Sequence, residues 1–294
     1  MPRSVSITMA LAVLLLAVLS LVSCDASMTT DVPANRDNSA AAVHNRIMVL
    51  DGWLGTGAMP CAADDTELLG KWMRQNVDSG IWWVGSQRDL DSVRCWIDDQ
   101  HRRVTPATRA GDAPSLHSAG RRSIYLGVIG PRIDQLAGYY AAGVRFARAP
   151  ATATDEWLNE ATRLGFAIDV SLISRATLAA RLSRNGPPFL YGWARTVDMM
   201  PDTGLVRKLS EDRGGVVLML PSDTPHVAAT GIADMRACLG RVSWEHCAIG
   251  GAADPAKLTA DLLDAGYAEG NVSRMFGFDM LRVLRKAEIW SGQR

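Results

Sequence analysis

The sequence predicts an α/β protein built as a single-domain (β/α)8 barrel of the TIM type. Short runs of β-branched and aromatic residues alternate with amphipathic segments of helical period along one continuous stretch. Eight such runs occur, over about the length usual for this barrel. A doubly wound open sheet is the structural alternative, because the alternation of strands and helices does not by itself show that the sheet closes.

Each expected strand is followed by a turn or a helical pattern. Thr154 or Asp155 can cap the helix that ends at Gly165, and Ser174 can cap the next one. The expected helices include 64–77, 89–103, 155–165, 174–186 and 203–215. The expected strands are 47–51, 81–85, 123–128, 144–147, 166–170, 188–191, 215–220 and 246–250.

The charge balance excludes one class of partner. Thirty-one basic residues match thirty-one acidic ones among 294, and neither sign forms a long run. A nucleic-acid partner is therefore not expected.

The N-terminus has the features of a secretory signal, with Arg3 ahead of an apolar stretch at 9–19 and a small-residue end. Residues 21–24, LVSC, resemble the bacterial lipobox, so residues 1–23 are predicted to be a lipoprotein signal peptide and Cys24 the lipidated residue. The apolar stretch is shorter than the roughly 20 residues that span a bilayer. A plain cleaved signal or an uncleaved anchor is the alternative. We expect a protein lipid-anchored to a bacterial membrane in the cell envelope, on its periplasmic or extracytoplasmic face.

Two further segments follow the signal. Residues 24–45 are small and polar, which predicts the lipidated Cys and a flexible tether, and the barrel is expected at 46–290. The remaining cysteines, Cys61, Cys95, Cys238 and Cys247, allow three complete pairings. At least two of them are expected to be isolated buried thiols.

Several motifs resemble, in order, those of the membrane (renal-type) dipeptidases, a metallopeptidase family with a (β/α)8 barrel. The most specific is the C-terminal stretch at 258–288, LTADLLDAGYAEGNVSRMFGFDMLRVLRKAE. The resemblance covers about 47–289. The shorter motifs are VLDG at 49–52, AAGVRF at 141–146, RLGFAIDVS at 163–171, EDRGGVV at 211–217 and HCAIGG at 246–251.

The resemblance implies two divalent metals, usually zinc, held by imidazoles and carboxylates at the strand ends. Those ligands are missing here, and no histidine occurs between His117 and His226. No zinc or other cofactor is therefore expected in this chain. The degenerate positions are Trp53 and Gly55 at the first strand, Ile129 at the third, Leu172 at the fifth, Trp193 at the sixth, Asp198 where the substrate-binding arginine should stand, and Ala252 after the last.

The surviving Asp51 and Asp169 are expected to act as strand-end hydrogen-bond acceptors, and the carbon side chains are expected to form an apolar plug. The sequence thus predicts a pseudoenzyme without catalytic residues, which binds an unknown envelope protein or a small peptide-like ligand. The alternative is an active metallodipeptidase, or another hydrolase, with a displaced site. The sequence leaves a homodimer open.

Overall fold

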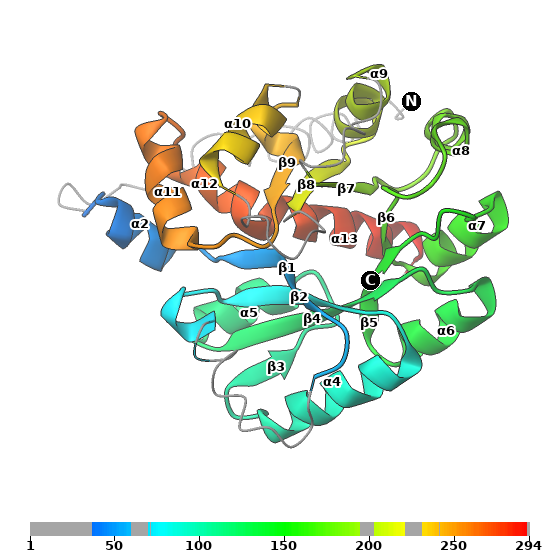
Figure 1. Ribbon diagram of the computed structural model, residues 1–294, viewed down its shortest axis with the longest axis horizontal. Coiled ribbons are helices and arrows are strands. Elements are labelled where there is room, and N and C mark those ends of the chain that lie inside the picture. The colour runs from blue at the N-terminus through cyan, green and yellow to red at the C-terminus, as the bar shows by residue number, and fades with distance from the viewer. Residues whose placement is uncertain are drawn as a thin grey trace, which may run out of the picture. The chain divides into compact units, whose positions relative to one another are not determined.

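The computed structural model describes residues 37–59, 70, 72–194, 203–220, 231–240 and 242–292. Residues from Ser39 onward form one compact unit. Its centre is a parallel sheet in the order β1-β2-β4-β5-β6-β7-β8-β9 (Figure 1). These strands are β1 (Leu50–Thr56), β2 (Ser79–Val84), β4 (Arg122–Ile129), β5 (Val144–Arg148), β6 (Ala167–Asp169), β7 (Leu190–Ala194), β8 (Val216–Leu220) and β9 (Cys247–Ile249).

The sheet curls until its first and last strands meet. The Gly251 amide, just after β9, donates a hydrogen bond to Asp51 Oδ1 in β1. A Cβ on Gly250 would lie 3.2 Å from Trp53 N, so the two strand ends are in close contact. The fold is therefore a nearly closed eight-stranded parallel barrel, which confirms the predicted (β/α)8 class and rules out the open sheet.

All eight expected strands form, with shifted ends. β1 continues through Trp53 to Thr56, and β7 continues to Ala194, so both run past their expected ends. One strand was not expected: β3 (Val104–Pro106) pairs with the first residues of β4 outside the barrel order. Three residues are too short for a recognisable alternation of buried and exposed positions.

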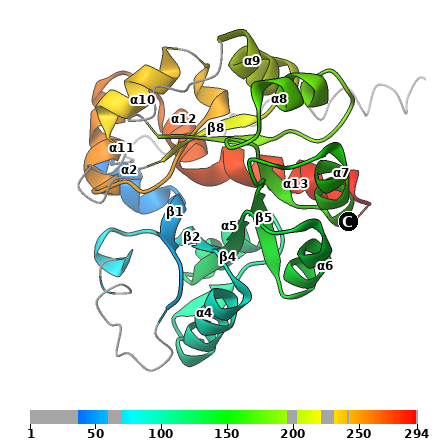
Figure 2. The same ribbon diagram turned by 45° about the vertical axis from the view of Figure 1, so that its right-hand side comes forward.

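Helices lie around the strands, as Figure 2 shows for α4, α6, α7 and α8. Thr154 and Ser174 cap α7 and α8 by accepting hydrogen bonds from the third residue along, as expected. The α-helices are α2 (Ala40–Arg46), α4 (Gln87–Asp99), α5 (Asp112–Ser118), α6 (Ile133–Ala141), α7 (Asp155–Leu164), α8 (Arg175–Leu182), α9 (Thr203–Arg207), α10 (Ile232–Leu239), α11 (Pro255–Asp264), α12 (Glu269–Ser273) and α13 (Asp279–Trp290). Short π-helical and 3-10 segments cover Lys208–Asp212, Trp244–His246 and Arg274–Phe278.

The barrel interior is a closed apolar cluster. Every barrel strand contributes to it, with large side chains such as Trp83, Tyr125 and Phe146 that are fully buried. Helix α13 adds Met280, Leu284 and two further apolar residues to the same cluster. Because one cluster unites all eight strands with α13, the lumen is a packed core and leaves no channel.

Two expectations need correction. Helix α2 lies within the segment expected to be a tether, and Val43 and His44 in it are buried. His44 Nδ1 lies 2.9 Å from Thr259 Oγ1 of α11, so the compact unit begins before residue 46.

Secondly, Cys238 and Cys247 form a disulfide, because the short connection from α10 to β9 brings their Cα atoms within 6.6 Å. Cys95 is also disulfide-bonded, so the expected isolated thiols are wrong for these cysteines.

Among the described residues, no helix is both long and apolar enough to cross a membrane. The predicted signal peptide and Cys24 lie outside the described part of the chain.

Candidate functional site

The carboxyl ends of the barrel strands, hereafter the barrel mouth, carry a buried ion pair. Arg148 is the last residue of β5 and Asp169 the last of β6, and the two are paired in the sheet register. Arg148 Nε donates to Asp169 Oδ2 at 2.6 Å. The side chains are 9% and 0% exposed, so the pair is shielded from water.

Asp169 is held from several sides. Its Oδ1 accepts hydrogen bonds from the backbone amides of Ser171, at 2.9 Å, and Gly192, at 3.2 Å. Asp51 has a similar role in β1, where Oδ1 accepts from the amides of Trp53 and Gly251. The expectation that both carboxylates serve as hydrogen-bond acceptors is confirmed, but only Asp169 ends its strand, because β1 continues past Asp51 to Thr56. The ion pair to Arg148 was not foreseen.

Two tryptophan rings flank the guanidinium of Arg148. Its Cζ lies 4.7 Å from the ring centroid of Trp53 and 5.5 Å from that of Trp83, within the range of cation–π attraction. The two rings are 5.6 Å apart. The cation is thus enclosed by aromatic faces on one side and by a carboxylate on another.

Glycines make room for the aromatic side chains of β2. A Cβ on Gly127 would lie 2.5 Å from the Trp83 ring, so β4 needs glycine at the point where that ring crosses it. Gly55 has the same relation to Trp82, whose ring would lie 2.2 Å from an added Cβ. Gly55 therefore has a packing role, and Trp82 occupies the space that a larger residue would need.

The other degenerate positions have different environments. Ile129, at the end of β4, is half-buried against the inner cluster, and Ala252 is buried after β9. Leu172 is 48% exposed, because it lies in the turn closed by the Ile173 amide and the Val170 carbonyl. The expected apolar plug is therefore wrong for Leu172. Trp193 lies in β7, but its side chain, like Asp198, is outside the described part of the structure.

Arg148 is the residue of the barrel mouth that sequence reasoning missed. The expected fourth strand ends at Ala147, so Arg148 is not part of it. The sequence did contain an indication of its role, because Arg148 directly follows a strand expected to be buried. An arginine at such a position needs either solvent or a polar partner.

The donors at the barrel mouth do not fit a divalent metal. Carbon side chains stand at Trp53, Ile129 and Ala252, and the oxygens of Asp169 bind Arg148 and backbone amides. Within the described ranges, no three His, Cys, Asp or Glu side chains come together in a way that could hold a metal ion. The side chains that the structure describes at the barrel mouth therefore do not supply the donor set of the dinuclear centre that the resemblance implied.

The phenol of Tyr191 is also unsuited to act as a general base. Tyr191 in β7 is buried, and burial together with the charge of Asp169 raises its pKa to about 12. The phenol is therefore protonated at neutral pH.

The strands and this site define a (β/α)8 barrel whose mouth holds an ion pair. No family model matches the sequence, and no curated protein matches it. Solved structures share the fold. An amidohydrolase from Pseudomonas aeruginosa superposes with a TM-score of 0.70 at 16% identity, covering 85% of this chain and 99% of that one. The probable dipeptidase PvdM from the same organism gives 0.68 at 14% identity, with 85% and 98% coverage.

A third structure is a metallopeptidase from Rhodobacter sphaeroides, liganded with a phosphinate mimic of the dipeptide L-Ala-D-Ala. Its TM-score is 0.65 at 13% identity, with 82% of this chain and 99% of that chain covered. Identities this low establish the fold alone. At that level they confirm the predicted resemblance to the membrane dipeptidases.

Proposed function

We propose that this chain is a pseudoenzyme of the bacterial cell envelope, which binds a partner protein or a small peptide-like ligand and does not hydrolyse it. The Arg148–Asp169 ion pair carries the proposal. A guanidinium stays protonated and has no lone pair to offer a metal. Its charge also repels a divalent cation at the place where a metallopeptidase of this fold needs one.

A binding role is supported by polar atoms without partners. Arg148 Nη2 and Ser171 Oγ are buried, and neither has a hydrogen-bond partner in the described part of the chain. Such orphaned atoms are uncommon in folded proteins and call for a ligand, a water or an ion to satisfy them. The ligand of the Rhodobacter sphaeroides metallopeptidase favours a peptide-like molecule here as well.

The first test is metal content together with turnover. The mature protein is expected to contain no stoichiometric zinc by mass spectrometry, because its donor set is carbon, backbone-bound carboxylate and guanidinium. With zinc added, it is expected not to hydrolyse L-Ala-D-Ala. A chelator-treated sample serves as the control for loosely bound metal.

Two metal ions per chain together with turnover would contradict the proposal. That result would favour the alternative, an active metallodipeptidase whose ligands come from other residues. Metal without turnover would leave the loss of catalysis standing but would contradict the explanation by Arg148.

We further propose that Cys24 carries a lipid that anchors the protein to a membrane. Cys24→Ser is expected to move the protein from the membrane fraction to the soluble fraction, or to stop removal of residues 1–23. The reason is that serine has no thiol to which the lipid could be attached. Immunoblotting of fractionated cells measures both effects. Unchanged processing and unchanged membrane attachment would contradict lipidation and indicate a plain anchor.

A further inference from the structure

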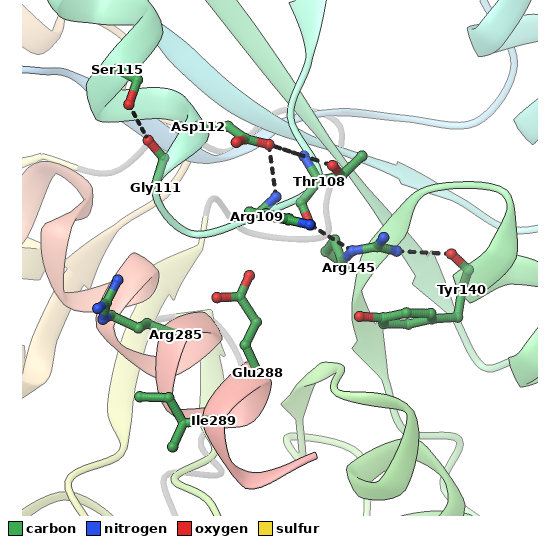
Figure 3. Close-up of a pocket in the computed structure, with 10 residues that line it drawn as sticks. All are labelled: Thr108, Arg109, Gly111, Asp112, Ser115, Tyr140, Arg145, Arg285, Glu288 and Ile289. Carbon is green, nitrogen blue, oxygen red and sulfur yellow. Dashed lines mark hydrogen bonds between the residues drawn. The ribbon is translucent and has the colours of Figure 1, made fainter. Parts of the chain in front are cut away.

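A cavity lies at the opposite end of the barrel from Arg148. Its volume is about 800 Å³. It is bordered by the segment from Thr108 to Ser115, by Tyr140 and Arg145, and by the C-terminal half of α13 (Figure 3). Arg145 is the second residue of β5, whereas Arg148 is the last, so the cavity opens at the amino ends of the strands. We refer to it below as the amino-end pocket.

Backbone carbonyls fix Arg145 in this pocket, and within the described ranges it forms no direct ion pair. Nε donates to the Thr108 carbonyl at 2.6 Å, and Nη1 donates to the carbonyls of Tyr140 and Val144, each at 2.8 Å. The guanidinium also stacks on Tyr140, with Cζ 3.9 Å from the ring centroid. These contacts hold the plane of the guanidinium and leave Nη2 without a protein acceptor in the described part of the chain.

Two more guanidinium groups border the same cavity. Arg109 precedes α5 and Arg285 lies on α13, and both are exposed. Neither forms an ion pair with any residue that the structure describes. Three arginines from separate elements therefore converge on one pocket with N–H donors to spare.

The two carboxylates of the pocket bind the backbone. Asp112 Oδ2 accepts from the amides of Thr108, at 2.7 Å, and Arg109, at 2.8 Å. Glu288 Oε1 accepts from the Ala110 amide at 2.8 Å. Burial raises the pKa of Glu288. The hydrogen bond from the Ala110 amide and the charges of Arg145 and Arg285 oppose this shift, and the charge of Asp112 adds to it. Three guanidinium groups thus face two carboxylates that already have donors, which leaves the pocket with excess positive charge.

We propose that the amino-end pocket binds a small molecule through an oxyanion, a carboxylate or a phosphate group. Guanidinium N–H groups pair with both kinds of oxyanion through parallel, charge-assisted hydrogen bonds. Arg145 is the rigid donor at the inner wall of the pocket. Arg109 and Arg285 donate to the anion from the rim. The site is independent of the proposed loss of catalysis, because none of its residues lies at the barrel mouth.

The test is calorimetric titration of the mature protein with inorganic phosphate and, separately, with succinate, at low ionic strength. Saturable binding of one anion per chain is expected. Arg109→Gln and Arg285→Gln are each expected to weaken it about tenfold, the usual effect of losing one charge-assisted hydrogen bond. Both residues are exposed, so the variants are expected to fold, and circular dichroism checks this.

Lys286→Gln is the matched control. It removes one positive charge from the same helix, but Lys286 Nζ lies beside Gly214 and does not border the pocket. Its binding is expected to equal that of the unaltered protein. Tighter binding of phosphate or of succinate tells which group the natural ligand carries. Absence of saturable binding by both, or an equal loss in Lys286→Gln, would overturn the proposal.

Discussion

Arg148→Met is expected to lower the free energy of unfolding by about 3–5 kcal/mol, the usual cost of removing one partner of a buried ion pair. The side chain of Asp169 is 0% exposed. Without Arg148, the hydrogen bonds that remain to Asp169 from the described residues come from the backbone amides of Ser171 and Gly192. Urea unfolding followed by circular dichroism measures the change, with the slope of the transition as a check on two-state behaviour.

Two variants make this prediction sharper. Asp169→Asn in the Arg148→Met background is expected to recover much of the loss, because a neutral amide oxygen can still accept from the same backbone amides. Arg163→Met is the control, since the ion pair of Arg163 with Glu160 is solvent-exposed and is expected to contribute at most about 1 kcal/mol. Equal effects of Arg148→Met and Arg163→Met would mean that the mouth ion pair is not buried in solution.

Trp83→Ala is expected to cost about 3–5 kcal/mol of unfolding free energy, as for other large aromatic truncations in cores. Trp83 is 0% exposed and belongs to the inner cluster. Its Nε1 donates to the Gly52 carbonyl at 3.0 Å, which joins β2 to β1. The truncation would open a cavity beside Gly127 and remove one of the two rings that flank Arg148.

Thermal or urea unfolding of Trp83→Ala should be compared with Trp290→Ala. Trp290 is 54% exposed at the end of α13 and is expected to change stability by no more than about 0.5 kcal/mol, as is usual for surface positions. If the two substitutions had similar small effects, the interior would not be packed as described.

The strands and the barrel class could be predicted because their signals are local. A buried strand such as β4 is a run of apolar residues whose length and flanking turns are visible in the chain. β3 was not predicted, because its residues, VTP, end in proline, a residue that is depleted in strands. The expected strand at 144–147 ends one residue before β5 does, so Arg148 was not expected at a strand end.

The candidate site was predictable only in part. Ile129 is the last residue of β4 and Ala252 follows β9, whereas Asp51 and Trp53 lie inside β1, which continues to Thr56. The prediction that Leu172 belongs to an apolar plug was wrong, because Leu172 lies in a turn that leaves its side chain exposed. The geometry of that turn depends on the backbone hydrogen bond from Ile173 to Val170. The amino-end pocket had no sequence signal, because its arginines come from three separate parts of the chain.

The sequence by itself determined the strands and their order along the chain, since periodicity and residue type are properties of the chain, but it left an open sheet as an alternative to the barrel. Only the tertiary structure decided what occupies the barrel mouth. Arg148 meets Asp169 because β5 and β6 pair in that register, and it meets Trp53 and Trp83 because the sheet curls into a barrel. Contacts between residues far apart in sequence arise from strand register and closure, which no local pattern specifies.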